Sequence, residues 1–315
     1  MLAHQALLYG SESEFLAGAV PFVRDGLNSG DPIRITTTRR NADWLRAALG
    51  ADARDVTFCE CSQWYRHPVR ALAALDRAAR AAAQHGQRLR MIGEPICGAR
   101  TASQIREWAG HESLVNAAVA TGNAMLVCSY DTRLVDPDVV ATVARTHPEL
   151  LVNGDPCPSP AYTDPVIFNA ERLRLPLPEL PPPALWLRFQ RTDQLATMRA
   201  FVCSHATAAG AAARPIEHFV QAVNEVTTNV IEHGGGSGVL QIWPGPDAVV
   251  CEVSDTGAGL RDPLAGYLPP AVNHPRGRGL WLARQFSDLV EVHSDSGGTA
   301  VRLHLNLTGE GHRAA

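Results

Sequence analysis

The stretch NEVTTNVIEHG, at residues 224–234, decides how this 315-residue chain is interpreted. It continues a run in which apolar residues recur every three or four positions, which predicts a helix with one buried face. Glu225 and Asn229 fall on the opposite face, at about 180° and about 220° from Ile216 when each residue turns the helix by about 100°. The two side chains are therefore neighbours one turn apart and can act on one ligand. The apolar face comprises Ile216, Phe219, Val220, Val223, Val226, Val230 and Ile231.

An amide beside a carboxylate suits a magnesium-bound nucleotide. Asn229 offers the hard oxygen that Mg²⁺ accepts while the ion keeps several waters and bridges phosphates. Glu225 can accept a proton from an attacking hydroxyl or water. Taken alone, Glu-x-x-x-Asn is more often a solvated helix face, so this interpretation depends on the neighbouring motifs.

The second motif, SDTGAG at 254–259, follows the strand-like run AVVCEVSD. The alternation ends at Asp255, which places that carboxylate at a strand end beside a glycine-containing turn. A buried carboxylate there can accept the exocyclic amine of adenine, and Gly257 and Gly259 let the backbone approach the base. An ordinary Asp-Thr-Gly turn is the alternative.

The third motif, RGRGLWLARQF at 276–286, places Gly277 and Gly279 before a patterned helix at 280–289. Free backbone N–H groups at a helix N-terminus predict a phosphate-binding turn. The guanidinium of Arg278 can fork onto phosphate oxygens, although a Gly-Arg-Gly that only begins a helix stays as the alternative.

Two further segments frame these motifs. Residues 260–276 hold four prolines and no periodicity, which predicts a loop long enough to close over a nucleotide. Residues 290–293 and 299–305 are typical of a closing hairpin around DSGG. Thr299 stands at its Gly-Gly-Thr entry, where it either hydrogen-bonds the nucleotide or simply begins a strand.

Residues 185–307 resemble the GHKL ATP-binding domain, which unites gyrase, heat-shock chaperone, histidine kinase and mismatch-repair ATPases. The three motifs carry this resemblance. It implies a Bergerat-type α/β sandwich in which Glu225 is the base and Asn229 binds Mg²⁺. The positions that the resemblance implies for nucleotide binding are Asn229, His233, Asp255, Gly257, Gly259, Gly277, Arg278, Gly279, Leu280 and Thr299.

The small size of this domain and its runs NVIEHG and GRGLWLARQF are most similar to serine/threonine kinases that act as bacterial anti-sigma factors. Those proteins phosphorylate an anti-sigma-factor antagonist and sequester a sigma factor when the antagonist is absent. The resemblance therefore implies an ATP- and Mg²⁺-dependent protein kinase with an antagonist, a sigma factor or both as partners.

Two alternatives to this kinase stay open. One is a non-catalytic ATP-binding module that sequesters its partner. The other is a histidine-kinase-like catalytic domain, which is disfavoured because the segment between the two halves is proline-rich instead of a long helix bearing a phosphoacceptor histidine.

The composition excludes other phosphate-handling classes, because all 28 basic residues are arginine. A P-loop NTPase and a eukaryotic-type kinase both need a lysine on their phosphates, and Schiff-base enzymes need a lysine amine. The GHKL superfamily places most of its phosphate recognition on Mg²⁺ and backbone amides, so it tolerates the lack.

Residues 1–150 alternate strand-like runs with Ala- and Arg-rich helical patterns, which predicts an α/β domain with a parallel or mixed sheet. The turn after the first run, GSESEF, lacks the glycines and lysine of a phosphate loop. Nucleotide hydrolysis in this half is therefore not expected. The runs are ALLY at 6–9, IRIT at 33–36, VTFCE at 56–60, LRMIGEP at 89–95 and MLVCSYD at 125–131.

This half resembles the MEDS domain, a sensory domain of methanogen and methylotroph regulators that is akin to a RecA-type fold without a P-loop. The likeness rests on His4 with ALLYGSESEF, VPFVRDGLNSGDP, GEPI, HESLVN and CSYD. Polar residues at strand ends can line a pocket for an unknown small ligand, or can equally be satisfied polar residues of a core. The candidates are His4, Glu94, His111, Glu112, Tyr130 and Asp131.

The predicted organisation has a sensory domain at 1–152 and a kinase domain at 185–307. Between them, residues 153–184 contain nine prolines and predict a semi-rigid linker. Residues 308–315 are expected to form a frayed tail. Two domains are the natural number for 315 residues with 45% hydrophobic content.

Net charge, hydropathy and cysteine content bear on the partners and the location of the protein. A net charge of −4 offers no basic footprint for direct nucleic-acid binding. No apolar run reaches the ~18 residues of a membrane span and no signal peptide is recognisable, so a cytoplasmic protein is expected. Seven scattered cysteines indicate reduced thiols, and Cys59 and Cys61 near His67 are too few ligands for a zinc site. A homodimer is left open.

Overall fold

The computed structural model describes residues 2–119, 123–181, 184–267 and 278–307. The chain divides into two compact units, Met1–Phe168 and Asn169–Ala315. The unit boundary falls inside the proline-rich segment at 153–184.

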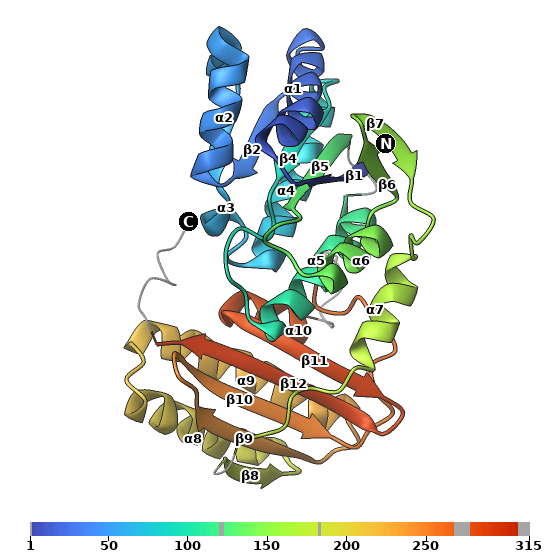
Figure 1. Ribbon diagram of the computed structural model, residues 1–315. Helices are drawn as coiled ribbons and strands as arrows, with labels where there is room; N and C mark the ends of the chain where they lie inside the picture. The colour runs from blue at the N-terminus through green and yellow to red at the C-terminus, as the bar shows by residue number, and fades with distance from the viewer. Residues whose placement is uncertain (1, 120–122, 182–183, 268–277, 308–315) are drawn as a thin grey trace. The chain divides into compact units, whose positions relative to one another are not determined.

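The N-terminal unit is built around a seven-stranded sheet of order β3-β2-β4-β5-β1-β6-β7 (Figure 1). Neighbouring strands from β3 to β6 are parallel, and β7 pairs antiparallel with β6. The predicted α/β unit with a mixed sheet is confirmed. The strands are β1 (Leu2–Tyr9), β2 (Ile33–Thr37), β3 (Thr57–Glu60), β4 (Leu89–Gly93), β5 (Ala124–Asp131), β6 (Glu149–Val152) and β7 (Asp155–Pro158).

Sequence analysis did not identify β6 and β7. Both are four residues long, and β7 carries two prolines, which normally argue against a strand. The turn between them is Asn153-Gly154, whose φ angles of 54° and 90° match the positive values that a two-residue hairpin turn requires. The Asn-Gly dipeptide was the sequence feature that could have predicted this hairpin.

Helices cover both faces of this sheet. Ile92 and Val127 pack in the core that α1 (Glu12–Asn28) and α2 (Arg39–Leu49) complete. Their neighbours in sequence point to the other face, because successive side chains on a strand alternate. That second face is covered by α4 (Pro68–Gln84), α5 (Ala102–Ala118) and α6 (Pro137–Thr146), and the short α3 (Cys61–Trp64) follows β3.

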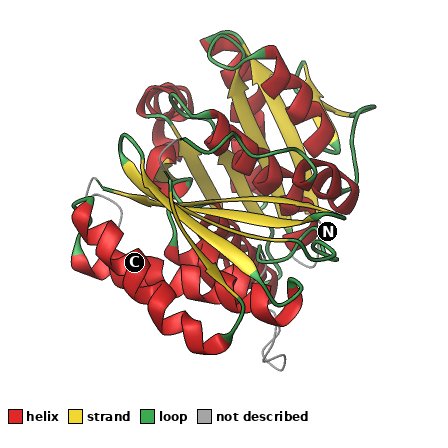
Figure 2. Ribbon diagram, turned by 90° about the horizontal axis from the view of Figure 1, so that it is seen from below, coloured by secondary structure: helices red, strands yellow, loops and turns green. Residues whose placement is uncertain are grey.

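The C-terminal unit is a two-layer α/β sandwich, as predicted. Its five-stranded sheet has the order β11-β12-β10-β9-β8, and every pair of neighbours is antiparallel. Figure 2 shows its helices gathered on one side of the sheet. The strands are β8 (Leu185–Phe189), β9 (Gly238–Pro244), β10 (Ala248–Asp255), β11 (Leu289–Asp295) and β12 (Gly298–Asn306), and the helices are α8 (Leu195–Ala208), α9 (Ala213–His233) and α10 (Gly279–Phe286).

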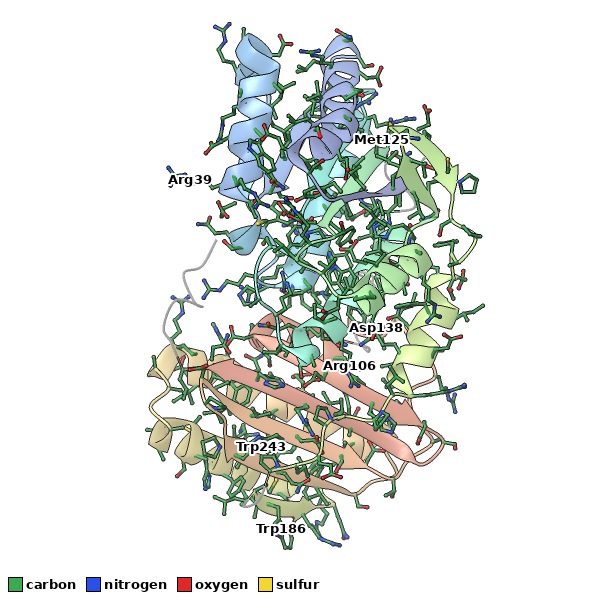
Figure 3. The ribbon with its side chains drawn as sticks, in the orientation of Figure 1. Arg39, Arg106, Met125, Asp138, Trp186 and Trp243 are labelled. Carbon is green, nitrogen blue, oxygen red and sulfur yellow. The ribbon has the colours of Figure 1, made fainter. Side chains whose placement is uncertain are left out.

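One apolar core joins the two layers of this sandwich. The predicted apolar face of α9 supplies Phe219 and Val223, which pack against Leu240 of β9 and Leu303 of β12. The opposite face of the sheet carries Trp243 (Figure 3), whose ring lies 5.2 Å below the guanidinium of Arg302. Because α9 buries one face, its other face is available to carry functional groups.

The proline-rich segment is partly ordered. Helix α7 (Pro165–Leu173) spans the boundary between the units, with Phe168 buried in the N-terminal core and Leu173 in the C-terminal core. Farther along, Arg302 donates a hydrogen bond of 2.8 Å to the carbonyl of Pro178. Residues 169–181 thus contribute directly to the C-terminal unit. The predicted tail at 308–315 lies outside the described residues.

Among the described residues, no helix has both the length and the apolar character needed to cross a bilayer.

We predict that a fragment comprising residues 169–315 folds alone and is more stable than one comprising 185–315, because the shorter fragment lacks Leu173. In the longer fragment, Leu173→Ala should lower the free energy of unfolding by about 2–5 kcal/mol. Urea unfolding followed by circular dichroism measures both effects. The matched control is Leu175→Ala, since Leu175 is 52% exposed, and equal losses for the two variants would contradict the assignment of Leu173 to this core.

Candidate functional site

A cavity of about 540 Å³ lies in the C-terminal unit between α9, the start of α10, the end of β10 and the start of β12. This volume is in the range that small-molecule sites occupy. All three sequence motifs contribute to its walls. Of the residues predicted to bind nucleotide, those that line the cavity are Asn229, His233, Asp255, Gly259, Gly279, Leu280 and Thr299.

Two backbone N–H groups hold Asp255 at the end of β10. Gly257 donates to its Oδ1 atom at 2.8 Å and Thr299 donates to the same atom at 3.3 Å. Among the described residues, none donates a hydrogen bond to Oδ2, which leaves that oxygen to a ligand in the cavity. Burial raises the pKa of Asp255, and the two hydrogen bonds partly offset this effect.

Glycines are required where other elements press against Asp255. A Cβ on Gly234, which follows α9, would lie 2.7 Å from the Asp255 carboxylate, and a Cβ on Gly257 would lie 2.9 Å from the Gly234 backbone. Gly298, with φ of 141°, packs against the carbonyl of Asp255. Gly234 and Gly298 were not predicted as site residues. The one sequence feature that could have indicated them was their position at the ends of predicted elements.

The β11–β12 hairpin is tied to the turn after Asp255 by polar contacts. Gly259, with φ of 78°, packs against the carbonyl of Asp295. The backbone N–H of Leu260 donates to the Ser294 hydroxyl at 2.7 Å, and that hydroxyl lies 3.2 Å from the hydroxyl of Thr299. Thr299 therefore helps to hold the hairpin against this turn, in addition to lining the cavity.

Asn229 lies against the first residue of α10. A Cβ on Gly279 would come within 2.6 Å of Asn229 Nδ2, so any other residue there would force the Asn229 amide to move. Arg278 is exposed and precedes α10 with helical dihedral angles. Gly277, also predicted to bind phosphate, lies outside the described residues.

The described part of the predicted lid forms one wall of the cavity, through residues 260–266. Its end is anchored by Tyr267, which is 3% exposed. The Arg284 guanidinium lies 3.7 Å from the centre of the tyrosine ring, and Arg172 donates a 2.5 Å hydrogen bond to its hydroxyl. The remainder of the predicted lid, 268–276, lies outside the described residues.

Glu225 is half-buried on α9, one turn before Asn229, and is not among the residues that line the cavity. His233 lines it at the end of the same helix and is exposed. The apolar part of the wall includes Val226, Val230 and Val301, a surface on which a flat base can lie. Sequence reasoning assigned the first two only to the core, because periodicity does not distinguish a core contact from a cavity wall at the core's edge.

The candidate sensory residues of the N-terminal unit fall into separate groups. Glu94 is buried and accepts hydrogen bonds from the Tyr9 hydroxyl at 3.2 Å, the Thr38 backbone at 2.9 Å and the Asn41 amide at 3.1 Å. Such a carboxylate is satisfied by the protein itself.

Asp131 is likewise satisfied. Its Oδ2 atom lies 2.7 Å from Arg133 Nη2 and 3.1 Å from Arg40 Nη2, and the hydrogen bonds from Arg133 lower the pKa of Asp131.

His4, Glu112 and Tyr130 lie together in the core, under the helices of the second face. Burial, with the adjacent His147, lowers the pKa of His4 to about 4. His111 and Glu112 line a cavity of about 20 Å³, which has room for about one water.

Each half of the chain matches a known family model. Residues 3–148 match the family model of MEDS, the methanogen/methylotroph, DcmR sensory domain. Residues 190–305 match that of the histidine kinase-like ATPase domain. Both resemblances are therefore confirmed at the level of a family-model match to each half, and an ATPase domain of the matched kind implies ATP binding.

Other comparisons add little. No curated protein matches the chain. A solved structure of the RsbU and RsbW domains of a Mycobacterium tuberculosis protein aligns with 22% sequence identity and a TM-score of 0.31 over 40% of this chain. The chain spans 32% of that structure's length, about a third.

We predict that Asp255→Asn weakens nucleotide binding about 10- to 100-fold, the equivalent of the ~1–3 kcal/mol that an unmade buried hydrogen bond costs. Asparagine keeps an oxygen for Gly257 and Thr299 but turns an N–H donor toward the adenine amine. Because burial disfavours the ionised carboxylate, the ligand-free variant should unfold at the same or a higher urea concentration.

Calorimetry with ATP and urea unfolding measure the two effects of Asp255→Asn. Asp247→Asn, at an exposed position in the β9–β10 turn, is the control and should change neither. Unchanged affinity in Asp255→Asn would remove Asp255 from the nucleotide site.

Proposed function

We propose that this protein is an ATP- and Mg²⁺-dependent protein serine/threonine kinase of the anti-sigma-factor type, controlled by its N-terminal sensory domain. The observation that carries the proposal is the meeting of Asn229, Asp255 and Gly279, from three separate motifs, at the walls of one cavity. The match of residues 190–305 to a histidine kinase-like ATPase domain supports nucleotide binding there.

Each end of the cavity suits one end of ATP. Asp255 Oδ2 accepts the exocyclic amine of adenine, and the valines of α9 and β12 contact the faces of the base. At the other end, the N-terminus of α10 directs backbone N–H groups toward phosphate oxygens. With adenine at Asp255, the nucleotide would lie along the cavity with its phosphates toward α10.

Asn229 fits the requirements of a magnesium ligand. Its amide lies where Gly279 has no side chain, so the group is positioned beside the phosphate end of the cavity. A single protein oxygen suffices, because Mg²⁺ keeps several waters and binds phosphates directly. The ion, when bound, neutralises charge that develops on the transferred phosphoryl group.

Glu225 would act on the substrate hydroxyl. The serine or threonine oxygen of a partner attacks the terminal phosphorus, the bond from that phosphorus to the leaving ADP oxygen breaks, and the hydroxyl proton passes to the Glu225 carboxylate. Glu225 lies one turn before Asn229 on the same helix, which is the observation that supports this role.

The partner follows from the resemblance of NVIEHG and GRGLWLARQF to anti-sigma-factor kinases. We infer an anti-sigma-factor antagonist as phosphoacceptor and a sigma factor as the protein that is sequestered. A kinase with these partners works in the cytoplasm, where its free cysteines stay reduced.

A second candidate is a module that binds ATP to set its shape and acts only by sequestering a partner. The position of Glu225 outside the cavity-lining residues favours it. Labelled ATP, incubated with the chain and candidate antagonists from the same organism, separates the two, since only the kinase transfers phosphate.

We predict that Asn229→Ala abolishes the dependence of ATP affinity on Mg²⁺. Removal of the amide leaves the ion without its protein oxygen, while the contacts to adenine persist. Titration calorimetry with and without Mg²⁺ measures this. Asn224→Ala is the control, because Asn224 lies on the same helix and its side chain bonds Arg199 instead. Undiminished Mg²⁺-dependent affinity in Asn229→Ala would exclude Asn229 as a ligand.

We further predict that Glu225→Gln keeps ATP affinity within about tenfold but lowers phosphoryl transfer by about 10²- to 10⁴-fold, the usual effect of a lost general base. Single-turnover transfer of labelled phosphate to the antagonist is the measurement. Glu232→Gln, exposed on the same helix, should transfer at the parental rate. Parental transfer by Glu225→Gln would exclude it as the base.

A further inference from the structure

Four potential metal ligands meet inside the N-terminal unit. His4 comes from β1, Glu112 from α5, Cys128 from β5, and His147 directly follows α6. All four residues are buried, and one ligand atom from each lies within 4.8 Å of the others. None of them belongs to the nucleotide site.

The spacing of these atoms is close to that of a tetrahedral metal site. His4 Nε2 lies 3.4 Å from Cys128 Sγ and 3.7 Å from Glu112 Oε2. Glu112 Oε2 lies 3.3 Å from His147 Nε2. Bonds of about 2.0–2.3 Å to Zn²⁺ place tetrahedral ligand atoms about 3.3–3.7 Å apart, so a small contraction of the remaining separations completes the geometry.

Neighbouring groups orient both imidazoles. Asn116 donates from its Nδ2 atom to the Thr146 carbonyl at 2.8 Å, which turns its Oδ1 atom toward His4 Nδ1, 3.0 Å away. His147 Nδ1 lies 2.9 Å from the Val143 carbonyl. Because both of these oxygens accept hydrogen bonds, each Nδ1 carries the proton and each Nε2 presents its lone pair to the cluster. Metal-binding histidines are held in this way.

The centre of the cluster has more hydrogen-bond acceptors than donors. The Nε2 lone pairs of both histidines face Glu112 Oε2, and the Cys128 thiol is the one donor that the four side chains direct into the cluster. Glu112 Oε2 and His147 Nε2 have no hydrogen-bond partner among the described residues. Buried polar atoms without partners are costly, and a cation at the centre of the four would satisfy them together.

We propose that the N-terminal domain binds a divalent transition-metal ion through His4, Glu112, Cys128 and His147. Two imidazoles, a thiolate and a carboxylate favour Zn²⁺ or a metal of similar chemistry over Mg²⁺ or Ca²⁺. Four protein ligands close the coordination shell, so the ion links β1, β5, α5 and the end of α6 and makes the fold of the domain depend on metal supply.

The test uses the full chain without a polyhistidine tag, loaded with Zn²⁺ or with Co²⁺ and dialysed. About one ion per chain is expected by elemental analysis, and the Co²⁺ form should show intense visible bands of a tetrahedral site with a near-ultraviolet thiolate-to-metal band. Cys128→Ser should lose the thiolate band, and His147→Gln should bind Co²⁺ at least about tenfold more weakly. Circular dichroism checks that each variant is folded.

Cys61→Ser is the matched control, because Cys61 is also buried in this unit but lies outside the cluster, and it should retain the full spectrum. A folded wild-type chain that binds no Zn²⁺ or Co²⁺ would overturn the proposal and leave a buried Glu112–His147 ion pair in its place. A Cys128→Ser chain with the wild-type spectrum would overturn it as well. Neither outcome bears on ATP binding, since the nucleotide cavity lies in the other unit.

Discussion

One carboxylate, Asp255 at the end of the central strand β10, organises the C-terminal unit. Two backbone N–H groups fix one of its oxygens, and Gly234 lets the end of α9 pack directly against it. Through these contacts the strand, the longest helix and the closing hairpin meet at one point. Asp255 also lines the cavity, so the contacts that organise this end of the C-terminal unit place a carboxylate at the proposed nucleotide site. Burial of this charge opposes folding, as expected for a group retained for binding.

Periodicity predicted the main elements of both units. The apolar repeat of α9 and the alternation of β10 were long enough to be recognised, and their ends placed Asn229 and Asp255 correctly on elements that meet. The proline-rich segment was predicted as a linker whose run VIFNAERLRL is apolar enough to dock on a domain, and Phe168 and Leu173 do bury in a core. Its helix α7 was not predicted, because the flanking prolines interrupt the pattern.

Tertiary packing also explains the site residues that sequence did not reveal. Gly234 and Gly298 act through what lies against their α-carbons, which no spacing along the chain encodes. The proposed metal ligands each come from a different segment, so no short sequence motif predicts the cluster of His4, Glu112, Cys128 and His147. By contrast, Glu94 was found from its strand-end position, yet hydrogen bonds within the protein satisfy it.

We propose that ATP binds with its adenine at Asp255 and its phosphates beside Asn229. A crystal structure of the full chain with Mg²⁺ and a non-hydrolysable ATP analogue would test this arrangement. We expect the adenine amine within about 3 Å of Asp255 Oδ2, and the ion bound to the side-chain oxygen of Asn229. An analogue bound elsewhere, or bound in this cavity with its phosphates at Asp255, would contradict it.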